Sequence, residues 1–223
     1  SIGEITAGVA HEINNPVAVI QGNVDVIRES LGESAASVET ELNLVDRQIV
    51  RIGAMVGKLL QFARPGEFGD FAESVDIGPL VNDSLVLINH QYSKQDIKVD
   101  CDLQAIAQVR IDPGEFQQVI INLIINAVQA MGDSGTLTIT SRDQSRDGVD
   151  GLSLTVADTG PGIKAEHLNT VCDPFLTTKS AEGTGLGLSI SQTIIQSAGG
   201  LITAANQPEG GAIFTVWLPE ASH

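Results

Sequence analysis

The feature that most constrains the fold is a set of nine apolar side chains in the first 31 residues, recurring every three or four positions. An α-helix brings such positions onto one face, because one turn takes about 3.6 residues. The pattern therefore predicts a helix over residues 2–31 with one buried stripe. The stripe consists of Ile2, Ile5, Val9, Ile13, Val17, Ile20, Val24, Ile27 and Leu31.

A second helical stripe follows, with the near-heptad spacing of a bundle helix. It should begin near residues 37–38 and end at 64–66, where the sequence reads Arg-Pro-Gly, and its apolar positions are Val45, Ile49, Ile52, Val56, Leu59 and Phe62. Two helices joined by a short loop at 32–34 form an antiparallel hairpin, which alone has too little surface to cover both stripes. A second copy would complete a symmetric four-helix bundle. The alternative is a hairpin that forms an interface and does nothing else.

His11 lies off the first stripe. It is two residues from both Val9 and Ile13, a rotation of about 200°, so it should face solvent. Glu12 is adjacent, and Asn15 lies one turn further along the same face. An exposed imidazole beside a carboxylate can act as a nucleophile. An ordinary solvated histidine is the alternative.

The pattern changes after residue 66. Residues 67–75 are rich in Gly, Phe and acidic residues and predict a linker. Helices are predicted at 77–92, 115–131 with Pro113 in the first turn, and 183–197; strands are predicted at 97–101, 108–111, 137–141, 152–157, 201–205 and 212–218. Mixed helices and largely antiparallel strands indicate an α+β sandwich with one layer of each.

Length and charge narrow the function classes. The 223 residues suit two modest domains, and 42% hydrophobic content argues against disorder. A formal charge of −16 disfavours nucleic acid and anionic membrane surfaces as partners. The two cysteines form neither a zinc spacing nor a disulfide framework, which suits a reducing compartment. No membrane-spanning run or signal peptide is present, and the helical pattern is already running at Ser1, so we expect a fragment without its upstream part.

Two amides, Asn122 and Asn126, stand four residues apart on one face of an otherwise apolar predicted helix. Their carbonyl oxygens are hard ligands suited to Mg²⁺ together with water and phosphate oxygens. The alternative is a pair of caps for neighbouring loops.

Two glycine-containing stretches are further candidates. Asp158 leaves a predicted strand and enters a loop with Gly160 and Gly162, where its carboxylate can accept a hydrogen bond from an amine such as that of adenine. Taken alone, this is also a common turn signature. The second stretch leads into a predicted helix N-terminus, where free amides favour phosphate. It reads Gly183, Thr184, Gly185, Leu186, Gly187, and it has neither the lysine of a P-loop nor the preceding strand of a dinucleotide fingerprint.

In combination, these motifs resemble the catalytic core of a sensor histidine kinase of two-component signalling, over nearly all of the chain. Residues 11–16 resemble the family's H box, 122–130 its N box, 158–162 its G1 box, 173–179 its F box and 183–187 its G2 box. The F box departs from the family by opening with Asp173 in place of Glu. Gyrase, chaperone and mismatch-repair ATPases share the N and G boxes but lack an H box, and they are the alternative.

The resemblance implies three segments: residues 1–66 as a dimerisation and histidine phosphotransfer hairpin, 67–75 as a linker, and 76–223 as an ATP-binding catalytic domain. It implies ATP and Mg²⁺ as cofactors, with adenine on Asp158 and the metal on Asn126 and Asn122. Residues 164–182 would form a lid, in which Cys172 is filler rather than a redox sensor. The other nucleotide-binding residues would be Gly160, Gly162, Phe175, Thr178, Lys179, Gly183, Thr184, Gly185, Leu186 and Gly187.

The resemblance also implies a reaction. Glu12 would polarise His11, which attacks the γ-phosphate, and the phosphoryl group would pass to an aspartate of a response-regulator receiver domain. An acid followed three residues later by Asn marks phosphatase activity in the family, and Glu12 with Asn15 fits that pattern. The implied protein is a homodimer in the cytoplasm, either free or as the cytoplasmic core of a membrane-anchored sensor. An ATP-binding dimeric scaffold without kinase activity is a further alternative.

Overall fold

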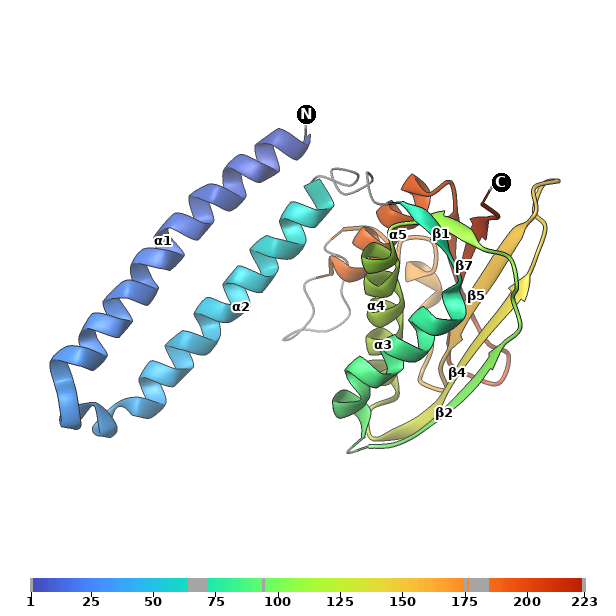
Figure 1. The fold of residues 1–223 in the computed structure, drawn as a ribbon. Helices are drawn as coiled ribbons and strands as arrows, with labels where there is room; N and C mark the ends of the chain where they lie inside the picture. The colour runs from blue at the N-terminus through green and yellow to red at the C-terminus, as the bar shows by residue number, and fades with distance from the viewer. Residues whose placement is uncertain (1, 64–71, 94, 175, 177–184, 222–223) are drawn as a thin grey trace. The chain divides into compact units, whose positions relative to one another are not determined.

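The computed structural model describes residues 2–63, 72–93, 95–174, 176 and 185–221. Contacts between residues divide the chain into two compact units, Ser1–Arg64 and Pro65–His223. Each unit is a separate body, drawn in blue to cyan and in green to red in Figure 1.

The first unit is a helical hairpin. Helix α1 (Ile2–Leu31) runs through Pro16, the 3₁₀ turn η1 (Gly32–Ser37) reverses the chain, and α2 (Glu39–Ala63) returns antiparallel to α1 (Figure 1). Gly32 ends α1 with φ +50°, a left-handed conformation that a residue without Cβ adopts easily. The hairpin predicted from the two stripes is thus present, with α2 beginning one or two residues later than predicted.

Arg28 ties the two helices together. Its Nη2 donates to Asp46 Oδ2 at 2.8 Å, and its Nε lies 3.7 Å from Glu39 Oε1. The Gln21 amide also donates to Asp46, at 3.2 Å. Asp46 is therefore held by two residues of α1.

The apolar stripes are only partly covered within one chain. Val24, Leu42 and Val56 are buried. Other apolar side chains of α1 and α2 remain between 38% and 71% exposed: Val19, Ile20, Val26, Ile27, Leu31, Leu44, Val45 and Val50. Ile20, Ile27 and Leu31 of the first stripe are therefore exposed in the single chain, because two helices cover each other on one side only, and a single hairpin was expected to leave part of the stripes uncovered.

The second unit is a two-layer α+β sandwich, as predicted. Its main sheet has the order β2-β4-β5-β7-β6, with β2 parallel to β4 and every other neighbouring pair antiparallel; β1 and β3 form a separate antiparallel pair. The strands are β1 (Glu73–Val75), β2 (Asp96–Leu103), β3 (Val109–Ile111), β4 (Ser134–Asp143), β5 (Gly151–Ala157), β6 (Leu201–Asn206) and β7 (Ala212–Pro219).

Three helices cover one face of this sheet: α3 (Ile77–Tyr92), α4 (Pro113–Met131) and α5 (Gly187–Ser197) (Figure 1). A short 3₁₀ turn, η3 (Ala165–His167), follows β5. The core lies between the layers, where alternate strand residues such as Leu137, Leu154 and Val216 are fully buried. Threonines at the intervening positions, such as Thr140 and Thr155, stand on the opposite, helix-free face.

Local signals explain where the helices begin. Asp112 Oδ1 accepts from the Glu115 amide at 2.9 Å, which caps α4, and Pro113 occupies a first-turn position where no amide is needed. Asp76 caps α3 in the same way, accepting from Gly78 at 2.9 Å. These caps fix where α3 and α4 begin, and α4 carries the two candidate amides.

The structure differs from the sequence prediction at two places in this unit. Strand β1 lies within the range predicted as a linker and pairs with β3. Helix α5 begins at Gly187 rather than at residue 183, since Gly185 has φ +65°, which is incompatible with an α-helix.

Among the described residues, no helix combines the length and the apolar character needed to cross a membrane.

Candidate functional site

One face of α4 connects the candidate stretches of the second unit. Asn122, Asn126 and Ala130 follow at intervals of four and so share that face. Asn122 contacts the start of α5 at Gly187, and Ala130 lies against Gly160 in the loop after β5. Eight residues at 1.5 Å place these two contacts about 12 Å apart along the helix. Asn126 therefore lies between the two glycine-containing stretches.

Asn122 is partly committed to holding α5. Its Nδ2 donates to the Gly187 carbonyl and to Ser191 Oγ, both at 3.3 Å. This is the capping role that the sequence left open as an alternative. Among the described residues nothing donates to its Oδ1, so the oxygen remains available as a ligand.

Asn126 is half-buried and makes no hydrogen bond with any described residue. A polar amide on a largely apolar helix face is normally satisfied by protein, water or ligand. Asn126 therefore presents both of its amide atoms to whatever lies between the loop at Gly160 and the start of α5.

Asp158 follows the last residue of β5 and is 2% exposed. Its Oδ1 accepts from the amides of Gly160 at 2.8 Å and Ala212 at 3.3 Å, and no described residue donates to its Oδ2. Burial raises the pKa of this carboxyl group, and the two amide hydrogen bonds partly oppose that rise by lowering the pKa. The remaining oxygen can accept a hydrogen bond from a ligand amine.

The loop after Asp158 needs glycine at two positions. A Cβ on Gly160 would lie 2.9 Å from Asp158 Oδ1 and 3.0 Å from the Ala130 carbonyl. Gly162 has φ +77°, and a Cβ there would lie 2.8 Å from Asn206 Oδ1. Both contacts are closer than side chains tolerate, so the glycines allow this loop to pack against α4 and β6.

The amides in the first turn of α5 have no partner among the described residues. Leu186 occupies the N-cap position, is buried, and provides no side-chain cap. The first backbone bond of the helix runs from Ile190 to the Leu186 carbonyl, so the amides of residues 187–189 have no partner within the helix. Free amides at a helix N-terminus favour an anion.

Five of the predicted nucleotide-binding residues lie outside the described residues: Phe175, Thr178, Lys179, Gly183 and Thr184. Of the predicted lid, residues 164–174 and 176 are described. Cys172 in that part is buried, and burial next to Asp173 raises the pKa of its thiol to about 11. A thiol so rarely ionised favours the filler role over a redox sensor.

The sequence predicted the turn between β6 and β7, at residues 208–211, but gave no sign that this turn contacts the Asp158 loop. The Gln207 side chain donates to the Asp158 carbonyl at 2.7 Å, and the Asp158 amide donates to Ala212 at 2.9 Å. A Cβ on Gly211 would come within 1.8 Å of the Asp158 carbonyl oxygen. The Gly210-Gly211 pair was the available signal, and it had indicated only a turn.

The candidates on the hairpin form a separate set. Glu12 and Asn15 are exposed on α1, and the His11 side chain lies outside the described side chains although its backbone is helical. Helical spacing still places Asn15 one turn from His11. The hairpin and the second unit are two separate compact units.

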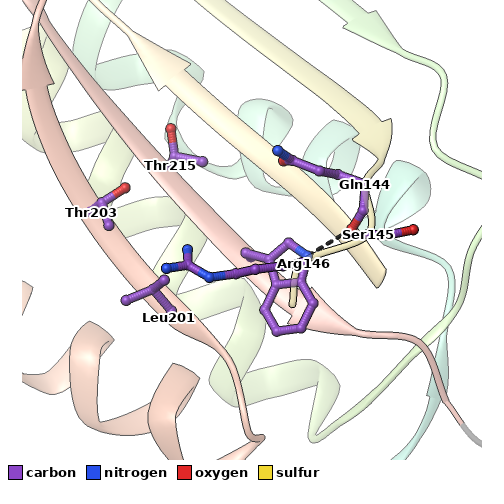
Figure 2. Close-up of a pocket in the computed structure, with 7 residues that line it drawn as sticks. Gln144, Ser145, Arg146, Leu201, Thr203 and Thr215 are labelled. Atoms are coloured by element: carbon purple, nitrogen blue, oxygen red, sulfur yellow. Dashed lines mark hydrogen bonds between the residues drawn. The ribbon is translucent and has the colours of Figure 1, made fainter. Parts of the chain in front are cut away.

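A pocket of about 270 Å³ lies elsewhere in the second unit, on the helix-free face of the sheet. Figure 2 shows residues that line it, among them Thr203 and Thr215 on the strands. The Trp217 indole nitrogen donates to the Gln144 carbonyl at 2.8 Å. None of the predicted site residues lines it. The candidate site is therefore defined by the motifs and their contacts, and not by this hollow.

The donor set around α4 suits a hard cation shared with phosphate. No described residue donates to the amide oxygens of Asn126 and Asn122, while the Asn122 nitrogen is bonded to α5. Mg²⁺ commonly takes few protein oxygens and completes its shell with water and phosphate. The described residues contain no group of three or more His, Cys, Asp or Glu side chains that could hold a metal.

Comparisons with known proteins agree with the two-unit organisation. The His Kinase A (phospho-acceptor) domain family matches residues 1–68. The family described as Histidine kinase-, DNA gyrase B-, and HSP90-like ATPase matches residues 111–222. The sensor histidine kinase ZraS of Escherichia coli (strain K12) is 32% identical over 220 residues, 98% of this chain and 46% of ZraS. The chain thus spans less than half the length of this curated relative.

Two solved structures resemble the fold. Full-length ShkA in complex with AMPPNP gives a TM-score of 0.81 at 23% identity, covering all of this chain and 47% of ShkA. The histidine kinase ThkA in complex with the response regulator protein TrrA gives 0.66 at 27% identity, covering 99% of this chain and 62% of ThkA.

Proposed function

Because the chain belongs to the Histidine kinase-, DNA gyrase B-, and HSP90-like ATPase family, as the catalytic core of a sensor histidine kinase, we propose that it phosphorylates its own His11 with ATP. The phosphoryl group then passes to an aspartate of a response-regulator receiver domain. The observation that supports the proposal is the α4 face, where Asn126, which has no hydrogen bond to a described residue, lies between the Asp158 loop and the N-terminus of α5.

The nucleotide would lie along this face. Asp158 Oδ2 accepts a hydrogen bond from the exocyclic amine of adenine, because its Oδ1 is already occupied by two amides. The free amides at the start of α5 bind phosphate oxygens. The distance of about 12 Å between the two contacts on α4 separates a base-binding end from a phosphate-binding end.

Mg²⁺ would be held by the amide oxygens of Asn126 and Asn122 together with phosphate oxygens and water. When bound, the ion offsets the negative charge of the triphosphate. The predicted contacts of Phe175, Thr178, Lys179, Gly183 and Thr184 complete the proposed nucleotide site.

His11 is the nucleophile of the proposed reaction. One imidazole nitrogen attacks the γ-phosphorus, the bond from that phosphorus to the bridging oxygen breaks, and ADP leaves with the electron pair. Glu12, exposed on the same helix, accepts the hydrogen bond of the imidazole N–H and raises the nucleophilicity of the other nitrogen. The product is a phosphohistidine on α1.

A response-regulator receiver domain is the proposed acceptor. The solved complex of ThkA with the response regulator TrrA, a relative at 27% identity, supports this class of partner. The same helix would also remove phosphate, since Asn15 is exposed one turn from His11 and could hold a water in line with a receiver phosphoryl group.

The hairpin would pair with a second copy. Its exposed apolar side chains on α1 and α2 support a four-helix bundle made by two chains, and no membrane or nucleic-acid contact is proposed for it. We keep the proposed division into a hairpin at 1–66, a linker at 67–75 and a catalytic domain at 76–223. The cytoplasmic location stays a prediction.

Incubation with γ-labelled ATP and Mg²⁺ tests the proposal. The wild-type chain should gain a label that is lost in acid and stable in alkali, as a phosphohistidine is. His11→Ala should remove the label entirely while leaving ATP affinity within about twofold. A label that persists in His11→Ala contradicts the assignment. ATP turnover that never depends on His11 would favour a gyrase-like or chaperone-like ATPase, and a chain that binds ATP without turnover or label would be a scaffold.

A further inference from the structure

The turn between β6 and β7 contacts the proposed adenine-binding loop through side chains that no sequence motif had singled out. Asn206, the last residue of β6, donates from Nδ2 to the Ile163 carbonyl and accepts at Oδ1 from the Ile163 amide, both at 2.7 Å. One side-chain amide thus satisfies both backbone groups of Ile163, as a neighbouring strand would.

The next residue acts on the other end of the same loop. Gln207 donates to the Asp158 carbonyl at 2.7 Å, and its backbone amide donates across the turn to the Gly211 carbonyl at 2.9 Å. This backbone hydrogen bond closes the turn, so the turn has a defined shape that does not depend on its contacts with the Asp158 loop. Consecutive side chains from one turn fasten the loop at Asp158 and at Ile163, five residues apart.

The loop between these two fastened points is inherently loose, because it carries Gly160 and Gly162. Glycine leaves the backbone with more freedom to lose on ordering than any other residue. The hydrogen bond of the Gly160 amide orients the Asp158 carboxylate, so disorder in the loop would reach the base-binding group directly. Asn206 Oδ1 also stands 2.8 Å from the place of a Gly162 Cβ, which links the choice of glycine to the presence of Asn206.

We propose that Asn206 and Gln207 are positioning residues for the nucleotide, which pre-order the loop from Asp158 to Ile163 so that ATP does not have to order it. This rests on the proposed ATP-binding function. Neither side chain contacts the nucleotide in this account; each acts through backbone of the loop. Without them the ordering cost falls on the binding step, so ATP affinity drops while the rate at saturating ATP changes little.

A matched control exists in the same unit. Asp143 is exposed like Asn206, and its Oδ1 also makes two hydrogen bonds to loop backbone, accepting from the amides of Ile106 and Ala107 at 2.9 Å each. None of these residues belongs to the candidate nucleotide site. Asp143→Ala therefore removes a comparable clamp without touching the Asp158 loop.

The test compares Asn206→Ala, Gln207→Ala and Asp143→Ala in the full chain, by calorimetry with Mg-ATP and by labelling kinetics. Asn206→Ala should raise the Kd and the KM for ATP about tenfold with the saturating rate within about twofold, and Gln207→Ala should raise them about threefold. Asp143→Ala should leave both constants unchanged. Asn206→Asp keeps the size but loses the donor to the Ile163 carbonyl, so it should bind ATP as weakly as Asn206→Ala.

Several outcomes would overturn the inference: unchanged ATP affinity in Asn206→Ala, an equal loss in Asp143→Ala, or full recovery in Asn206→Asp. Hydrogen exchange at the Ile163 amide provides a second measurement that needs no ATP. The exchange should accelerate in Asn206→Ala and stay as in wild type in Asp143→Ala, and equal exchange in all three chains would contradict the clamp. A wild-type chain that binds no ATP would instead contradict the proposed function.

Discussion

The hairpin and the second unit differ in how completely each buries its own apolar residues. The largest fully buried side chains of the described residues all belong to the second unit, among them Phe116, Leu123 and Leu154. Among the described side chains of the hairpin, Val56 at 4% exposure is the most buried apolar residue, while Val50 is 71% exposed. The second unit encloses a core within one chain, although it leaves Val86 and Ile106 exposed, whereas the hairpin has a row of exposed apolar side chains along both helices.

The difference follows from architecture. A sheet covered by three helices encloses a core between two layers, while two helices can bury only the faces they turn toward each other. The two units also divide the proposed chemistry, with His11 on the incomplete unit and the nucleotide site on the complete one. Mutations in the hairpin should therefore leave ATP affinity intact, and mutations at the nucleotide site should leave dimer formation intact.

The largest changes in rate are expected for hairpin variants, which should separate autophosphorylation of His11 from dephosphorylation of a receiver domain. Glu12→Ala should slow labelling of His11 by about 10²–10⁴-fold, the usual contribution of general-base assistance. Asn15→Ala should leave labelling nearly unchanged and slow the loss of phosphate from a receiver domain. Rates of labelling and of receiver dephosphorylation are the measurements, and ATP affinity should stay constant in both variants. Equal damage to both activities by Asn15→Ala would make its role structural.

In the second unit, Asp158→Asn should weaken ATP binding about 10–100-fold, since it removes a charged acceptor from the base-binding position. Its thermal midpoint at pH 7 should not fall. Burial raises the pKa of Asp158 above its ordinary value of 3.8, so ionisation costs stability. That cost is absent below the unfolded pKa, grows as pH rises toward the folded pKa and is fully present above it. The stability advantage of the variant should therefore disappear near pH 3, as calorimetric unfolding at both pH values would show.

Deletion of residues 1–66 should convert a dimer into a monomer without unfolding the second unit. The wild-type chain should show a hairpin transition whose midpoint rises with protein concentration, because dimer formation stabilises it by mass action. The truncated chain should unfold at a midpoint independent of concentration and bind ATP as before. Light scattering checks the mass of both chains at tens of micromolar. A dimer that survives the deletion would contradict the prediction that the hairpin forms the dimer interface.

The smallest effect is expected for the ion pair between Arg28 and Asp46. The hydrogen bond from Arg28 holds the pKa of Asp46 below its ordinary value of 3.8, so the pair stabilises the hairpin above that pH and is lost as pH falls through the lowered pKa. Asp46→Asn should lower the hairpin midpoint by only about 1–2 °C at pH 7, since exposed pairs contribute little. The two chains should converge once the pH falls below that lowered pKa, and a drop confined to the second-unit transition would contradict this account.

The sequence predicted elements whose signals are local. The apolar periodicity placed a helix over residues 115–131 with Pro113 in the first turn, and the structure has α4 over Pro113–Met131, capped by Asp112 and followed by Gly132. Strand β1 was missed because three residues are too few to show alternation, and only its pairing with β3 makes it a strand. The start of α5 was placed too early because the glycines before it carry no side-chain periodicity.

By itself, the sequence determined the hairpin, the two-layer sandwich and the identity of His11, Asn126 and Asp158 as candidates, because periodicity and motif spacing act over short stretches of chain. Only the tertiary structure decided that the Asn122 amide nitrogen is bonded to α5, while Asn126 has no hydrogen bond to a described residue. It alone also showed that Asn206 holds Ile163 across 43 positions of sequence. Such contacts join residues from different elements, and no local pattern encodes which partner a polar side chain meets when those elements pack.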